Sequence, residues 1–128
     1  MKDFFKYQGP AVLWALFILV MCGMSLGSVG ESHLFFPGFD KVTHCGLFFV
    51  QVVWIAKGMI RKNGSLHFSY GQAAVALFIS IFYGAAIEVL QTYVFTWRDG
   101  DWGDLASDVI GACMAIFCIL VTLFQTKR

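Results

Sequence analysis

The sequence predicts an all-α, polytopic membrane protein of four transmembrane helices packed as an antiparallel bundle, and three observations lead to this prediction. Hydrophobic residues make up 59% of the 128-residue chain and charged residues only 13%, whereas soluble domains carry roughly 25% charged residues. Four apolar runs approach or exceed the length of about 20 residues that a helix needs to cross the hydrocarbon layer. Short polar connections separate them, which favours antiparallel neighbours in a single domain, residues 1–128.

The first two apolar runs begin differently. The first, Tyr7–Gly30, follows a short basic start; we expect a retained helix because the run is long for the core of a signal peptide, and cleavage near its small residues is the alternative. The second, Phe39–Ile60, follows the turn signal Pro37-Gly38. We expect Asp40 to cap this helix by accepting hydrogen bonds from its first amides. His44 lies one helical turn beyond Asp40 on the same face.

The third run, Phe68–Phe95, contains one charged residue, Glu88. Glu88 and Gln91 are three positions apart and share a helix face with Gly84. Small residues on such a face allow membrane helices to approach closely. A carboxylate within a membrane span is costly, so we expect Glu88 to face a polar partner or a wet cavity.

The fourth run, Leu105–Phe124, follows the acidic connection TWRDGDWGD. We expect Asp101 or Asp104 to cap this helix. One stripe of the helix is acidic near its start and small further along, which favours contact with another helix in lipid. The residues of the stripe are Asp104, Asp108, Gly111, Ala112 and Ala115.

The distribution of basic residues predicts the orientation, because lysine and arginine in short loops mark the cytoplasmic side. Both termini and the connection after the second run are basic, whereas the other two connections hold most of the acids. Both termini are therefore expected in the cytoplasm. This orientation places the following polar set on the extracytoplasmic side, where we expect its members to converge: Asp40, His44, Glu88, Arg98, Asp101, Asp104 and Asp108.

Three interpretations of this polar set concern its charges. The charges can simply neutralise one another, since polar contacts between membrane helices contribute about 1 kcal/mol each. They can form an acid–base site, in which crowded carboxylates gain raised pKa values. They can also bind a membrane lipid or a lipid-linked envelope precursor, with Arg98, Trp97 and Trp102 at the mouth and Arg98 holding a phosphate or carboxylate. The candidate catalytic groups are Glu88, Asp104, Asp108 and His44. The candidate ligand-binding residues are Asp40, Lys41, Gln91, Arg98 and Asp101.

A metal site is the fourth interpretation, and an oxygen-rich set would suit Mg²⁺ or Ca²⁺ better than Zn²⁺. The sequence lacks HExxH and paired-histidine spacings, so it predicts no metal ligands and identifies no cofactor. The four cysteines all lie in apolar runs, where a free cysteine is most often a small buried hydrophobe. No nucleophile and no nucleic-acid-binding signature is recognisable.

The order of these polar residues resembles the VanZ-like family of small, multi-span bacterial membrane proteins. The family has a DK-x-x-H-x-x-x-F element, then E-x-x-Q, then an arginine and spaced aspartates that lead into a glycine-containing last helix. One departure concerns Asp108, because the family often has an asparagine near that glycine. The matching residues here are Asp40, Lys41, His44, Phe48, Glu88, Gln91, Arg98, Asp101, Asp104, Asp108 and Gly111.

The resemblance implies a multi-pass protein of the bacterial cytoplasmic membrane that handles a lipid-associated component of the cell envelope. The founding member of the family is linked to lowered susceptibility to the glycopeptide teicoplanin, and the resemblance implies the same link for this chain. It supplies no reaction. The alternatives are a membrane enzyme that acts on a lipid-linked phosphate and a structural accessory subunit.

Overall fold

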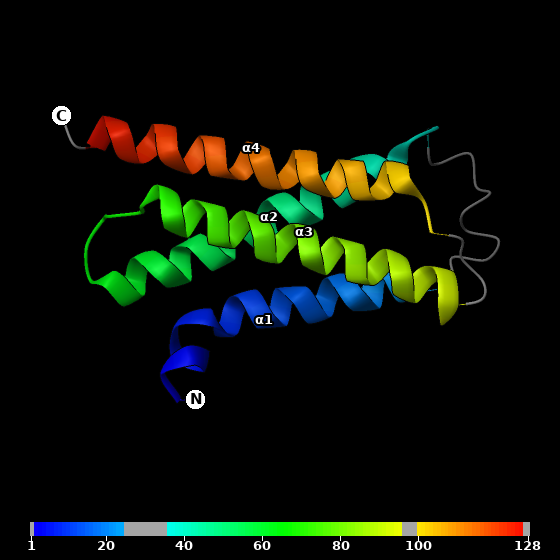
Figure 1. Cartoon of the computed structure of the whole chain (residues 1–128), viewed down its shortest axis with the longest axis horizontal. Helices are drawn as coiled ribbons and strands as arrows, with labels where there is room; N and C mark the ends of the chain where they lie inside the picture. The colour runs from blue at the N-terminus through cyan, green and yellow to red at the C-terminus, as the bar shows by residue number, and fades with distance from the viewer. Residues whose placement is uncertain (1, 25–35, 96–99, 127–128) are drawn as a thin grey trace.

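The computed structural model describes residues 2–24, 36–95 and 100–126, and these residues form four α-helices and no strand (Figure 1). Each helix is long and apolar enough to cross a membrane. The prediction of an all-α, multi-pass membrane protein is therefore confirmed. The helices are α1 (Lys2–Gly23), α2 (Phe39–Asn63), α3 (Tyr70–Tyr93) and α4 (Trp102–Thr126).

The four helices run up and down beside one another (Figure 1). The first residues of α1, the turn between α2 and α3 and the last residues of α4 lie at one end of the bundle. At the opposite end, α1 and α3 finish while α2 and α4 begin. We call this opposite end the polar end, because most of the acidic side chains within the described helices gather there.

The closest helix pair is α2 with α4, which share the most extensive contact in the bundle. Gly111 makes this approach possible, because a Cβ atom there would collide with the backbone carbonyl oxygen of Cys45. Ala112 and Ala115 on the same stripe are fully buried and pack with Val52 of α2. The predicted stripe of small residues is therefore a helix contact, as expected for packing in lipid.

The start of α2 corrects one prediction. Asp40 does not cap this helix: Gly38 occupies the N-cap position with a left-handed φ of 85°, and no side chain caps the helix. The helix begins two residues earlier than a cap at Asp40 requires, so Asp40 lies within the first turn. Its charge still favours the amino end of the helix dipole. The predicted turn at Pro37-Gly38 is present, with the Phe39 amide bonded to the Phe36 carbonyl oxygen at 3.0 Å.

The start of α4 confirms the other capping prediction. Asp101 precedes the helix, and its Oδ1 accepts a hydrogen bond from the Gly103 amide at 2.7 Å. The boundaries of α1 differ from the predicted run, since the helix begins at Lys2 and ends at Gly23. The predicted extension over residues 25–30 lies outside the described residues.

Candidate functional site

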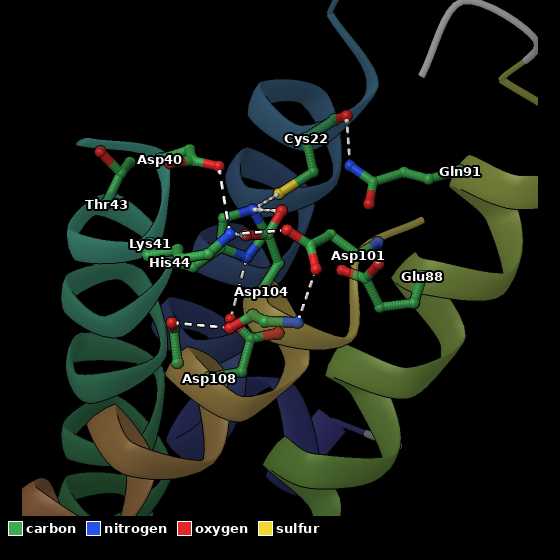
Figure 2. Close-up of polar contacts among 12 residues, drawn as sticks. Cys22, Asp40, Lys41, Thr43, His44, Glu88, Gln91, Asp101, Asp104 and Asp108 are labelled. Carbon is green, nitrogen blue, oxygen red and sulfur yellow. Dashed lines mark hydrogen bonds and ion pairs between the residues drawn. The ribbon is translucent and has the colours of Figure 1, made fainter. Parts of the chain in front are cut away.

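Polar side chains from α2, α3 and α4 meet inside the polar end (Figure 2). His44 comes from α2, Glu88 from α3 and Asp108 from α4, and one nitrogen or oxygen atom of each lies within 4.8 Å of the others. His44 and Asp108 are buried, and Glu88 is half-buried. We call these three residues the inner trio.

A second group lies nearer the ends of the helices, around the Lys41 ammonium. Lys41 Nζ is 2.6 Å from Asp101 Oδ2, 3.1 Å from Asp104 Oδ1 and 3.6 Å from Asp40 Oδ2. We call the three aspartates the outer trio. Asp40 and Asp101 are exposed, whereas Asp104 is buried. Lys41 therefore ties the start of α2 to the start of α4 through Asp101 and Asp104.

Helical spacing produces both groups from the same two helices. His44 follows Lys41 by three positions on α2, and Asp108 follows Asp104 by four on α4, so each pair shares a face about one turn apart. The pairing of α2 with α4 then brings His44 Nδ1 to 2.9 Å from Asp108 Oδ1. The other ring nitrogen, Nε2, lies 3.7 Å from Asp104 Oδ2. His44 thus connects the inner trio to the outer trio.

Glu88 connects α3 to the start of α4. Its Oε2 accepts a hydrogen bond from the Asp101 amide at 2.8 Å, while its buried Oε1 has no hydrogen-bond partner. The Asp101 side chain lies outside the membrane-spanning helices. The hydrogen bond from Lys41, assisted by the one from the Gly103 amide, holds the pKa of the Asp101 carboxyl below its usual range.

Cys22 of α1 and Gln91 of α3 border the inner trio on the side that faces α1. Gln91 Nε2 donates to the Cys22 carbonyl oxygen at 3.0 Å, and Cys22 Sγ lies 4.0 Å from His44 Nε2. Sequence reasoning treated Cys22 only as a buried hydrophobe. No local pattern could have placed it beside His44, because the contact depends on how α1 packs against α2.

The site combines an oriented imidazole with an excess of negative charge. Asp108 fixes the orientation of the His44 ring, which is the usual way to prepare a histidine for proton transfer. Among the described residues of the polar end, five carboxylates face one lysine and one histidine. The carboxylates are Asp40, Glu88, Asp101, Asp104 and Asp108.

The predicted convergence of polar groups from three helices is confirmed for the described residues, and their chemical roles stay predictions. Of the candidate residues, Arg98 lies outside the described part of the chain, as does Trp97. Trp102 begins α4 and is strongly exposed at the polar end. The structure brings these candidates to one end of the bundle: Asp40, Lys41, His44, Glu88, Gln91, Asp101, Asp104 and Asp108.

Comparison with known proteins identifies no relative of this chain. No family model, no curated protein and no solved structure matches the chain. What the chain does is therefore inferred from the geometry of the polar end and from the family that its residue order resembles.

Proposed function

We propose that the chain is a VanZ-like protein of the bacterial cytoplasmic membrane whose polar end binds the headgroup of a lipid-associated envelope component. The observation that carries the proposal is the position of Lys41. Its ammonium is part-exposed at the membrane surface and lies above the buried His44–Asp108 pair. A hydrogen-bonding headgroup can therefore meet a part-exposed ammonium and, beneath it, buried polar groups.

The proposed orientation puts the polar end outside the cell and both termini in the cytoplasm. The turn between α2 and α3 supports this orientation, because three basic residues lie at or near the end of α2 that leads into the turn. They are Lys57, Arg61 and Lys62. The described beginning of α1 and end of α4 lie at the same end of the bundle (Figure 1). Basic residues in short loops favour the cytoplasmic side. A headgroup bound at the polar end would then belong to a lipid of the outer leaflet, where envelope precursors are used.

Lowered susceptibility to teicoplanin is the cellular consequence that we propose from the family resemblance. The test compares a sensitive bacterial host that expresses wild type, Glu88→Gln or Asp104→Asn at matched membrane abundance. Asp3→Asn is the matched control, because it removes one carboxylate from the first turn of α1 at the other end of the bundle. We expect protection by wild type and Asp3→Asn and its loss in both polar-end variants. No protection by wild type would contradict this proposal.

An enzyme that acts on a lipid-linked phosphate is the second candidate, and the buried His44–Asp108 contact of 2.9 Å favours it. An imidazole held by a carboxylate can accept a proton from an attacking water. Phosphate release from polyprenyl diphosphate by the purified protein would test this candidate. We expect turnover to disappear in His44→Gln while the protein stays folded. No release by wild type would exclude this substrate.

A further inference from the structure

We propose that the inner trio binds a divalent transition-metal ion, with His44, Glu88 and Asp108 as its protein ligands. The proposal concerns the ion alone and does not depend on which envelope component the polar end binds. Three ligands from three helices leave coordination positions for water or a bound headgroup, as in metal sites that act on substrates.

The first argument is that buried acceptor atoms lack donors. Glu88 Oε1, Gln91 Oε1 and Asp108 Oδ2 are buried and have no hydrogen-bond partner among the residues that the structure describes. The Asp108 side chain is fully buried, and a buried acceptor atom without a hydrogen bond is costly. All three atoms are oxygens, so among the described residues the polar end is short of donors and cations rather than of acceptors.

The second argument is a comparison with the outer trio, which has the same carboxylate chemistry. Its three aspartates surround Lys41 Nζ at 2.6 to 3.6 Å, so a cation already occupies the centre of that group. The inner trio has no lysine or arginine contact among the described residues. His44 is the one basic group there, and a divalent ion would neutralise the two carboxylates that it faces.

The third argument is that the ligand atoms need little movement. Ligands held about 2.0–2.2 Å from a tetrahedral ion lie roughly 3.3 Å apart. His44 Nδ1 and Asp108 Oδ1 are 2.9 Å apart. One potential ligand atom from each residue of the inner trio lies within 4.8 Å of one from each of the other two. Admission of an ion therefore requires shifts that side-chain rotation can supply.

Two further residues fit the surroundings of a metal ligand. A histidine that binds a metal through one ring nitrogen usually donates the other N–H to a carboxylate, and His44 Nε2 faces Asp104 Oδ2 at 3.7 Å. Gly84 makes room for the third ligand, because a Cβ atom there would lie 2.7 Å from Asp108 Oδ2. The missing side chain at position 84 lets Asp108 lie against α3 one turn from Glu88.

The ligand set indicates the class of metal. Imidazole favours ions such as Zn²⁺, and carboxylates are shared by Zn²⁺ and Mn²⁺. One imidazole with two carboxylates therefore points to Zn²⁺ or Mn²⁺ rather than to Ca²⁺. The sequence predicted no metal ligands because the three residues come from different helices and have no recognisable local spacing.

The test uses the full-length protein in detergent micelles, stripped with a chelator and then titrated with ZnCl₂ or MnCl₂. Bound metal is measured by mass spectrometry after desalting, and thermal unfolding is followed with and without the ion. We expect about one ion per chain and a raised Tm on metal addition. Glu88→Gln and Asp108→Asn are expected to weaken binding by at least about tenfold. Asp3→Asn, which removes one carboxylate from the other end of the bundle, is the matched control and is expected to keep wild-type affinity.

X-ray absorption of the wild-type zinc complex tests the ligands without any variant. The account predicts one imidazole nitrogen and oxygen neighbours, with no sulfur. No metal uptake by wild type would overturn the proposal, and so would a sulfur ligand or equal affinity in all three variants. Circular dichroism and size-exclusion chromatography identify any variant that fails to fold, and the wild-type spectrum then decides.

Discussion

The outer and inner trios lie within one end of the same bundle but balance their charges differently. In the outer trio, the Lys41 ammonium lies 2.6 to 3.6 Å from three aspartates near the ends of the helices. In the inner trio, Glu88 Oε1 and Asp108 Oδ2 are buried without a partner. The difference follows from depth, because a lysine can keep its charged end near water only when it lies close to the surface. One turn deeper, the neutralising charge must come from histidine, a proton or a bound ion.

Both trios depend on the close approach of α2 and α4. The largest loss of stability is therefore expected from a substitution at the tightest contact between these two helices. Gly111→Ala places a Cβ atom against the Cys45 carbonyl oxygen, and backbone cannot move aside as a flexible side chain does. We expect a loss of about 1–3 kcal/mol in stability and the disruption of both groups. Thermal unfolding of purified protein is the measurement. Gly46→Ala on α2 is the control, since a Cβ atom there meets nothing within 4 Å. Equal stability of the two variants would show that the approach is looser than described.

Removal of Lys41 should make the outer trio resemble the inner one. In Lys41→Met, Asp104 stays buried without its ammonium partner, so we expect a lower Tm in metal-free buffer. Three unpaired carboxylates should then bind a second divalent ion, raising the uptake from about one ion per chain to about two. Metal analysis of Lys41→Met beside wild type measures this directly. Unchanged uptake would mean that carboxylates without a resident cation are insufficient for metal binding here.

A milder substitution tests the room that Gly84 provides in the inner trio. Gly84→Ala would push on Asp108 Oδ2, which would lie 2.7 Å from the new Cβ atom. Because the carboxylate can rotate, we expect a several-fold loss of zinc affinity rather than its abolition. Gly71→Ala on the same helix is the control, as its Cβ atom meets only Ser69 Oγ at 3.8 Å. Wild-type affinity in Gly84→Ala would place Asp108 outside the coordination sphere.

The smallest change in thermal stability is expected from substitution of Asp101, which is exposed and belongs to the outer trio. Its lowered pKa means that the ionised contact with Lys41 contributes stability above the ordinary carboxyl range and loses it as the pH falls through the lowered value. Asp101→Asn should therefore reduce the Tm slightly at neutral pH, with a difference that shrinks in acid and in high salt. Thermal unfolding across pH measures this. A difference that grows in acid would contradict the assigned partner.

Hydropathy was sufficient to predict the helices, because a membrane span must be a long apolar segment whatever its neighbours are. Gly111 and the alanines after it also indicated a helix contact before the structure placed them against α2. The polar end was predicted as a region, since Glu88 and Asp108 are costly in lipid wherever the helices lie.

The details of the polar end needed the structure, because they depend on helix rotation and pairing. Asp40 was predicted to cap α2, yet Gly38 takes that position by adopting a conformation open to few other residues. Cys22 became part of the site only through the packing of α1. The division into a lysine-filled outer trio and an inner trio with unpartnered oxygens arises from the pairing of α2 with α4, which no local spacing reveals.

The most direct test of this division is anomalous X-ray scattering from crystals of the wild-type protein grown with Zn²⁺. The account predicts one anomalous peak between His44, Glu88 and Asp108, and no peak among the outer aspartates around Lys41. A peak in the outer trio, or none at the polar end of a zinc-saturated crystal, would contradict the central claim that the inner trio is the cation site.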